Sequence, residues 1–121
     1  MSKVLIIDDD AMARRMAEFS LKKLGLTAVS AGSGAEGLVR MREDSPDLTL
    51  LDVEMPEMDG ISVLKAVRLD AQLQDAPVCL MTGTVTDSLR AEADTLHACG
   101  LLQKPLAPPA LKAMLEEIGM L

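Results

Sequence analysis

Aromatic residues are almost absent from this sequence. Phe19 is the single aromatic among 121 residues, and there is no tryptophan or tyrosine, although 49% of the residues are hydrophobic. That hydrophobic content is enough for a compact core in a chain of this length. Leucine and the nine methionines are therefore expected to fill the core in place of aromatic rings.

Positive charge is also scarce, since 12 lysines and arginines stand against 19 aspartates and glutamates and leave a net charge of −7. Binding to a phosphate backbone needs a basic patch, so this balance argues against nucleic acid as a direct partner. No apolar stretch approaches the length of a membrane span, and the first residues lead directly into a predicted strand. The sequence therefore predicts a soluble, cytoplasmic protein that does not bind a membrane.

Residues typical of redox and zinc sites are few. Cys79 and Cys99 lie far apart, in neither CxxC nor zinc-ligand spacing, and Cys79 falls within an apolar run typical of a core. The single histidine, His97, lies near the end of a predicted helix, where a surface imidazole is expected rather than a catalytic one. These patterns favour neither a disulfide nor a zinc site.

The sequence does contain a regular alternation of apolar strands and amphipathic helices. Short apolar runs predict strands at residues 4–7, 26–30, 48–52, 78–81 and 101–103, each followed by a helical pattern. No linker or repeat interrupts residues 1–121, which are expected to form one domain without an output domain. Strict alternation predicts an α/β fold with a doubly wound, five-stranded parallel sheet of strand order 2-1-3-4-5.

The first predicted helix runs to about Leu24. Met12, Met16 and Phe19 are expected to form its apolar face, while Arg14 and Arg15 face water. Asp and Ser residues mark the starts of three helices as capping or turn residues: Asp10, Ser33 and Asp59.

Reactive side chains gather where the predicted strands end. Asp8 and Asp9 follow the first strand, Asp52 ends the third, Thr82 follows the fourth and Lys104 the fifth. In the order 2-1-3-4-5 these strands are neighbours, and their carboxyl ends open onto one crevice. Three carboxylates there repel one another unless a cation neutralises them, and an oxygen-only site favours a hard ion such as Mg²⁺. A carboxylate beside a metal can act as a nucleophile on phosphorus, with a lysine and a hydroxyl stabilising the transferring group.

Four segments, VLIIDDD, LLDVEMPEMDG, LMTGT and LLQKP, resemble in order and spacing the signatures of the response-regulator receiver domain, the CheY-like module of two-component signalling. The resemblance covers the whole chain and implies the CheY-like, flavodoxin-type (βα)5 fold. It implies that Asp52 is the phosphoacceptor. It also implies a site for Mg²⁺ or Mn²⁺ in which Asp9 binds the ion directly and Asp8 binds it directly or through a water. Asp52 and the backbone carbonyl of Glu54 complete the implied protein ligands.

The same resemblance assigns the positive and hydroxyl groups of the crevice. Thr82 would move to the phosphoryl group and Lys104 would pair with it. The Lys104–Pro105 bond would be a cis peptide that orients the lysine. Glu54 and Thr84 occupy positions that either tune the lifetime of the phosphoryl group or simply face solvent.

Two positions depart from the family pattern. Leu101 stands where the family usually has the Tyr or Phe that turns inward when the threonine moves, so the path of the signal to the fourth helix, fifth strand and fifth helix is in question. Either Leu101 repacks or the output uses another surface. Leu106 stands where Phe is common, and this change is expected to affect packing only.

The resulting hypothesis is a single-domain response regulator. It would accept its phosphoryl group from a histidine kinase or a histidine phosphotransfer protein and then change its affinity for a downstream protein. Its only catalysis would be its own phosphorylation and dephosphorylation. Two alternatives stay open: an adaptor that works without phosphorylation, which the missing aromatic at Leu101 favours, and an aspartyl-nucleophile phosphatase, for which Glu54 lies at the offset of a general acid.

Overall fold

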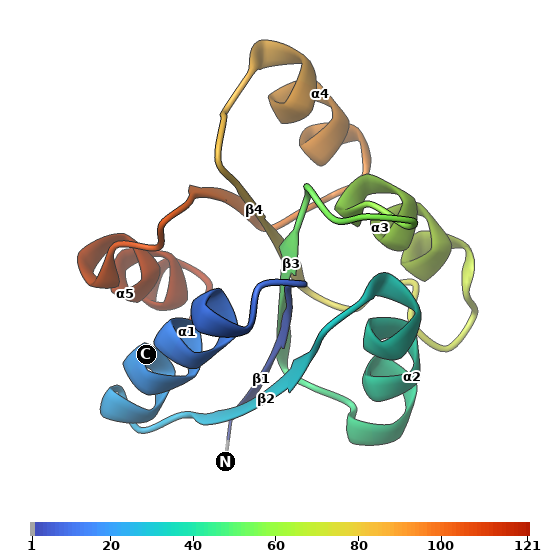
Figure 1. Cartoon of the computed structure of the whole chain (residues 1–121). Helices are drawn as coiled ribbons and strands as arrows, with labels where there is room; N and C mark the ends of the chain where they lie inside the picture. Colours follow the sequence, from blue (N-terminus) through green and yellow to red (C-terminus); the bar gives the residue numbers. More distant parts are fainter. Residues whose placement is uncertain (1) are drawn as a thin grey trace.

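The computed structural model describes residues 2–121, which form five strands and five helices in strict alternation (Figure 1). None of the helices in this part of the chain is long and apolar enough to cross a membrane. In chain order, the elements are β1 (Lys3–Ile7), α1 (Ala11–Lys23), β2 (Thr27–Ala31), α2 (Gly34–Asp44), β3 (Leu48–Asp52), α3 (Gly60–Leu69), β4 (Val78–Thr82), α4 (Asp87–Thr95), β5 (Gly100–Gln103) and α5 (Pro108–Glu117).

The five strands form one parallel sheet in the order β2-β1-β3-β4-β5, which confirms the predicted fold class. β3 and β4 are buried at every position, and β1 is buried after its first residue. Both faces of these strands are covered, and such strands are continuously apolar because neither face meets water. The edge strands β2 and β5 are only partly buried along most of their length, in line with their weaker apolar pattern.

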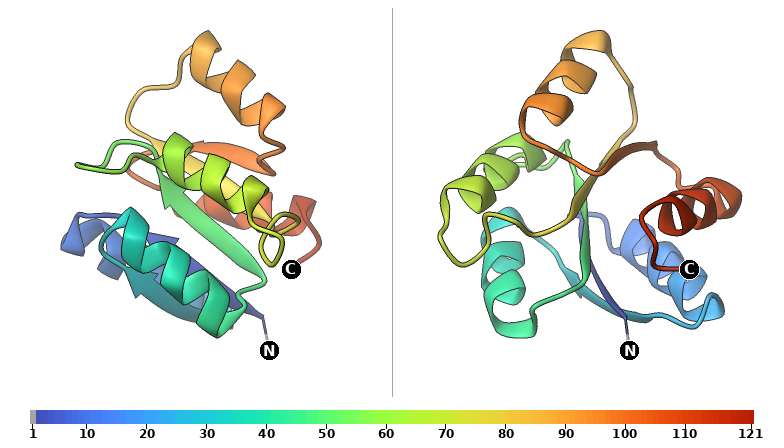
Figure 2. Two further views of the ribbon diagram at one scale, coloured as in Figure 1. Left: turned by 90° about the vertical axis from the view of Figure 1, so that its right-hand side faces the viewer. Right: turned by 180° about the vertical axis from the view of Figure 1, so that it is seen from behind.

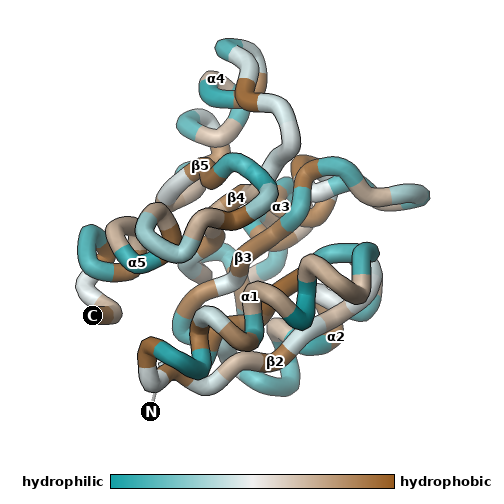
Figure 3. The backbone as a smooth tube through the Cα atoms, turned by 60° about the vertical axis from the view of Figure 1, so that its left-hand side comes forward, coloured by the Kyte–Doolittle hydropathy of each residue, from teal (hydrophilic) through white to brown (hydrophobic). Residues whose placement is uncertain are grey.

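The helices form two layers (Figure 2). α1 and α5 cover one face of the sheet, where Leu21 and Leu115 pack against Ile6 in one hydrophobic core. α2, α3 and α4 cover the other face, where Met41 and Leu64 belong to a second core. Figure 3 shows hydrophobic residues concentrated along β3 and β4 between these layers.

Capping side chains define where four of the helices begin. The carboxylates or hydroxyls of the N-cap residues accept hydrogen bonds from backbone amides of the first turn, which would otherwise have no partner. This confirms the predicted caps Asp10, Ser33 and Asp59 and adds Thr86 at the start of α4. Gly25 after α1 has a φ of 83°, the left-handed conformation that glycine adopts without strain.

The predicted apolar face of α1 is wrong. Met12, Met16 and Phe19 are 61%, 57% and 65% exposed, while Ala17 and Leu21 are buried against the sheet. Two apolar stripes run along this helix, and the one with Ala17 and Leu21 faces the sheet. The methionines therefore do not all fill the core, although Met41, Met55, Met81 and Met114 do so.

Candidate functional site

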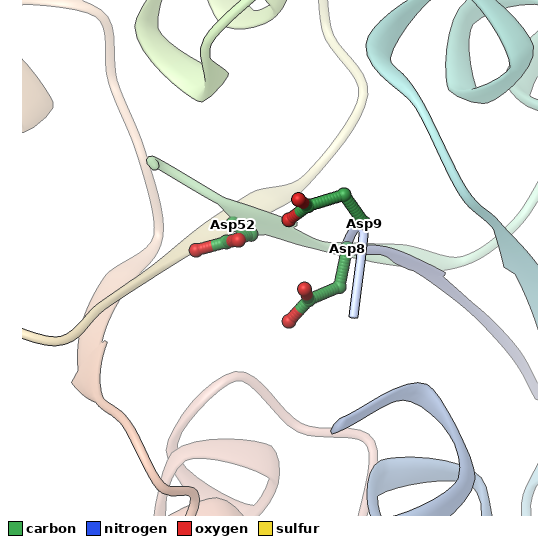
Figure 4. Close-up of side chains that lie close together, drawn as sticks. All are labelled: Asp8, Asp9 and Asp52. Atoms are coloured by element: carbon green, nitrogen blue, oxygen red, sulfur yellow. The ribbon is translucent and has the colours of Figure 1, made fainter. Parts of the chain in front are cut away.

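Three carboxylates meet at the carboxyl ends of β1 and β3. One oxygen from each of Asp8, Asp9 and Asp52 lies within 4.8 Å of the others. Figure 4 shows Asp8 and Asp9 extending from the end of β1 on the side where Asp52 lies. Asp8 and Asp52 are 1% and 2% exposed, whereas Asp9 is exposed to solvent. The structure thus brings together the three acids that the strand ends predict.

Backbone contacts hold the loop that follows Asp52. The amide of Val53 donates to the carbonyl of Met81 on β4, at 2.8 Å, and the amide of Gly60 donates back to the carbonyl of Val53, at 2.9 Å. A Cβ atom at Gly60 would collide with the carbonyl oxygen of Asp52. Glycine is therefore required where α3 begins against the end of β3, and this close approach fixes the backbone of Asp52.

Lys104 supplies the positive charge of the site. Its Nζ lies 2.7 Å from Oδ2 of Asp8 and 3.3 Å from Oδ2 of Asp52. Its backbone amide donates to the carbonyl of Thr82, at 2.7 Å, so the backbone of the lysine, just after β5, is held beside the end of β4. Burial disfavours the charged ammonium, but the hydrogen bond to Asp8 and the charge of Asp52 outweigh it and raise the pKa of Lys104. The lysine therefore stays charged at neutral pH.

Asp52 is short of stabilising contacts for a buried carboxylate. Its Oδ1 accepts no hydrogen bond from any described residue, although it is buried. Burial and the charge of Asp8 raise the pKa of Asp52 to about 6, even though Lys104 acts in the opposite direction. A buried acceptor oxygen without a donor costs free energy, and functional sites are where such costs are retained. Oδ1 of Asp52 is therefore free to bind a cation or to attack an electrophile.

The donor set fits a hard divalent cation. Asp8, Asp9 and Asp52 offer only carboxylate oxygens, and neither His nor Cys belongs to this cluster among the described residues. Mg²⁺ prefers such oxygens and completes its octahedral shell with waters, for which the exposed Asp9 leaves access. Oδ1 of Asp52, which has no hydrogen-bond donor among residues 2–121, fits the role of one of these oxygen ligands to the cation. The predicted contribution of the Glu54 carbonyl stays a prediction.

The hydroxyl of Thr82 is already engaged. It donates to Oε2 of Glu54, at 2.8 Å, and the carbonyl of Thr84 lies 3.0 Å from the hydroxyl oxygen of Thr82. The amide of Thr84 donates to the hydroxyl oxygen of Thr82, at 3.2 Å. The other carboxylate oxygen of Glu54, Oε1, accepts from the amide of Gly83 at 2.9 Å. These contacts could not be predicted from the residue pattern, because Glu54 is an exposed side chain in a loop.

The family departures lie on β5 and just after it. Leu101 is half-buried and packs against the core under α2, α3 and α4, beside Leu80 of β4. Leu106 is also half-buried, on the α1–α5 side. The Lys104–Pro105 bond is cis, as the resemblance implied. The structure therefore places an aliphatic side chain where the signal path of the family would use an aromatic ring.

Arg14 has a role that the sequence did not indicate. Instead of facing water, its guanidinium donates to the backbone carbonyl of Asp8, at 2.7 Å, and so ties α1 to the end of β1. His97 follows α4 at the surface, as predicted. Cys79 is buried, and burial raises its pKa to about 12, so its thiol is a core group.

A surface groove joins the exposed stripe of α1 to this site. A cavity of about 870 Å³ lies between α1 and α5 and is lined by Met16, Phe19, Leu24, Pro108 and Pro109 together with Arg15, Lys23 and Lys112. A second cavity of about 400 Å³ shares Met16 and Pro108 with it and continues to Asp8 and Lys104. The groove is thus apolar along its floor and basic at its rim, and it leads to the acidic cluster.

Comparison with known proteins places the chain in one family. The family model described as "Response regulator receiver domain" matches residues 4–116. A probable chemotaxis protein CheY of Rhizobium etli is 35% identical over 117 residues, which cover 96% of this chain and 91% of that protein. The solved structure of chemotaxis protein CheY4 of Vibrio cholerae has a TM-score of 0.91 at 31% identity, with 98% of each chain covered.

Longer proteins contain the same module. A probable transcriptional regulator ycf27 of Guillardia theta is 35% identical over 118 residues, which cover 96% of this chain but 44% of that protein. The chain therefore spans about half the length of the transcriptional regulators that it matches.

Proposed function

The chain belongs to the response regulator receiver family, and from this premise we propose that Asp52 accepts a phosphoryl group from a phosphohistidine in two-component signalling. The donor is a histidine kinase or a histidine phosphotransfer protein. A carboxylate oxygen of Asp52 forms a bond to phosphorus while the N–P bond of the phosphoimidazole breaks. The bonding electron pair stays on the ring nitrogen, and the donor histidine is left neutral once that nitrogen is protonated.

The observation that carries the proposal is the state of the Asp52 carboxylate. One oxygen faces Lys104 at 3.3 Å, and the other is buried without a hydrogen-bond donor from the described residues. Lys104 therefore holds the carboxylate in place and offers positive charge to an incoming phosphoryl group. Bound at Asp8, Asp9 and Asp52, Mg²⁺ or Mn²⁺ would neutralise the charge of the carboxylates and of the phosphoryl oxygens.

The output is a change in affinity for a protein partner. A phosphoryl group on Asp52 adds acceptor oxygens and negative charge between Lys104 and Thr82, and it need only shift a two-state equilibrium by a few kcal/mol, as a bound ligand would. The face made by α4, β5 and α5 is proposed to bind the target. The phosphatase alternative would need Glu54 free to protonate a leaving group, whereas its carboxylate accepts hydrogen bonds from Thr82 and Gly83.

The phosphoryl donor is proposed to dock in the groove of α1. Its apolar lining includes Met16 and Phe19 and continues past Met12 to Asp8 and Lys104, so a helix lying there can present its histidine to Asp52. The basic rim includes Lys23, whose Nζ lies 5.4 Å from the centre of the Phe19 ring. In a chain of net charge −7, this rim favours a donor helix with acidic flanks. A second copy of this chain is a poorer occupant of the groove, because it would bring the basic side chains of two such grooves together.

Direct labelling tests the proposed function. The protein is incubated with acetyl phosphate and Mg²⁺, and its intact mass is measured for wild type and Asp52→Asn, with EDTA as the metal-free control. One phosphoryl adduct is expected in wild type with Mg²⁺ only. An adduct of equal extent in Asp52→Asn, or in EDTA, would contradict the assignment of the acceptor or of the metal. If acetyl phosphate gives no adduct, a phosphorylated histidine phosphotransfer protein is used as the donor, and absence of labelling there rejects the proposal.

A further inference from the structure

Glu54 joins two loops at the edge of the site. It lies in the β3–α3 loop, two residues after Asp52, and both of its carboxylate oxygens are engaged by the end of β4 and the loop after it. Oε2 accepts from the hydroxyl of Thr82 at 2.8 Å, and Oε1 accepts from the amide of Gly83 at 2.9 Å. Two successive residues are therefore held by one side chain, in the way that two parallel hydrogen bonds fix an orientation.

The hydroxyl of Thr82 has a single proton, and this makes its partners mutually exclusive. The proton can go to Glu54 or to the carbonyl of Thr84, which lies 3.0 Å away, and the charged acceptor is the stronger of the two. Thr82 is 1% exposed, so water does not replace these partners easily. To donate to a phosphoryl oxygen on Asp52, Thr82 must first leave Glu54.

We propose that Glu54 is a positioning residue that holds Thr82 and Gly83 in the unphosphorylated arrangement and releases both when Asp52 is phosphorylated. The inference rests on the proposed function of Asp52. A phosphoryl group competes with the Glu54 carboxylate for the same hydroxyl proton, and the two anions repel each other. Release of Gly83 then frees residues 83–86, which connect β4 to α4.

This release offers a path for the signal that needs no aromatic ring. Leu101 packs within the core, and its aliphatic side chain has no hydroxyl or ring to follow the movement of Thr82. Thr86, at the end of the same loop, caps α4 through its hydroxyl and the amide of Leu89, at 3.1 Å. A shift of Gly83 therefore reaches α4 along the chain, through four consecutive residues.

The test compares Glu54→Ala and Glu54→Gln with wild type by NMR of backbone amides. Glu57→Ala and Glu57→Gln are the matched controls, because Glu57 lies in the same loop, is exposed and accepts no hydrogen bond from the described residues. Spectra are recorded without ligand and with Mg²⁺ and beryllofluoride, which mimics a phosphoryl group on a carboxylate. Amides of residues 87–95 report on α4 away from the substitution itself.

In the absence of ligand, Glu54→Ala is expected to move the α4 amides along the line that joins free and beryllofluoride-bound wild type. The Gly83 amide should exchange with solvent about tenfold faster, since it loses a charge-assisted acceptor. The affinity for beryllofluoride should rise about tenfold in Glu54→Ala. Glu54→Gln keeps one acceptor oxygen and should fall between Glu54→Ala and wild type, while both Glu57 variants behave as wild type.

Three results would overturn the inference. The α4 amides of free Glu54→Ala could coincide with those of wild type. Glu54→Gln could raise the beryllofluoride affinity as much as Glu54→Ala, which would show charge repulsion alone. The Gly83 amide of bound wild type could keep its slow exchange, which would show that Glu54 is never released. Failure of wild type to bind beryllofluoride would instead reject the proposed role of Asp52, while the spectra of the free variants would still report on Glu54.

Discussion

Replacement of Asp52 by Asn is expected to stabilise the metal-free protein at neutral pH. Burial and the charge of Asp8 raise the pKa of Asp52 from 3.8 to about 6 in the folded protein. The unfolded chain keeps the ordinary value. Between these two pKa values the folded state binds more protons than the unfolded state, so the free energy of unfolding falls as the pH rises through this window and stays reduced above it. The ionised carboxylate therefore destabilises the fold at neutral pH.

The size of the effect follows from the two pKa values. A difference of about two pKa units corresponds to about 3 kcal/mol well above pH 6, and to about 1 kcal/mol near pH 4.5. Asn has nearly the shape of the protonated acid and carries no charge, so Asp52→Asn should gain about these amounts. At neutral pH, a gain of that size raises the melting temperature of a domain of this length by roughly 10 °C.

The assay is urea unfolding in EDTA at the two pH values, with Asp75→Asn as the control because Asp75 is an exposed acid. The control should stay within about 0.5 kcal/mol of wild type. Millimolar Mg²⁺ should narrow the gap at neutral pH, since it stabilises the wild type by binding to the folded state while the variant lacks one ligand. If Asp52→Asn gained the same unfolding free energy at both pH values, or gained none at neutral pH, burial and repulsion by Asp8 could not be what destabilises the ionised Asp52 carboxylate.

Three further variants test other parts of the site. The double variant Met16→Ser, Phe19→Ser should be phosphorylated at least tenfold more slowly by a histidine phosphotransfer protein. Its labelling by acetyl phosphate should be unchanged, because both side chains are exposed and lie outside the site. An equal loss of rate with both donors would argue against docking in the groove of α1. Lys104→Met should raise the pKa of Asp52 further, measured by carbon NMR of its carboxyl, since the ion pair at 3.3 Å is lost; an unchanged pKa would contradict this role. Gly60→Ala should lower the free energy of unfolding by about 2 kcal/mol in urea, because the new Cβ meets the carbonyl of Asp52; a neutral effect would show that the loop yields.

The strands and their reactive ends could be predicted because their signals are local. A strand buried on both faces must be apolar throughout, so the residue at which the apolar run stops also marks the edge of the sheet. Asp52 ends β3 and Thr82 ends β4, and Asp8 and Lys104 directly follow β1 and β5. Parallel order then places these ends together without any knowledge of side-chain conformation.

The buried face of α1 could not be predicted in the same way. Its sequence has apolar residues on two stripes, one with Met12, Met16 and Phe19 and one with Ala17 and Leu21. Periodicity gives the spacing of a stripe, and it does not say which of two stripes faces the sheet. The larger side chains of Met12, Met16 and Phe19 suggested the core, but Ala17 and Leu21 are the residues that pack against the sheet. The exposed stripe then became available as a surface.

The contact between Glu54 and Thr82 was hidden for a different reason. The two residues are 28 positions apart, and the bond depends on the conformation of an exposed loop side chain, which no local pattern encodes. This contact bears on how phosphorylation of Asp52 would change the protein. Lys104 is already bound to Asp8 and Asp52, and Thr82 is already bound to Glu54, so both groups that would stabilise a phosphoryl group have partners before it arrives.

A phosphoryl group on Asp52 therefore gains the hydroxyl of Thr82 as a donor only by replacing Glu54 as its acceptor. Lys104 can follow the new charge with little movement, because it lies 3.3 Å from Asp52 already. Thr82 cannot, because its proton is held by Glu54 on the adjacent loop. The energetic difference between the two states then depends on the exchange of Glu54 for a phosphoryl oxygen as the acceptor of one hydroxyl. Since Gly83 is held by the same carboxylate, that exchange is also the step at which the chemistry of Asp52 reaches α4.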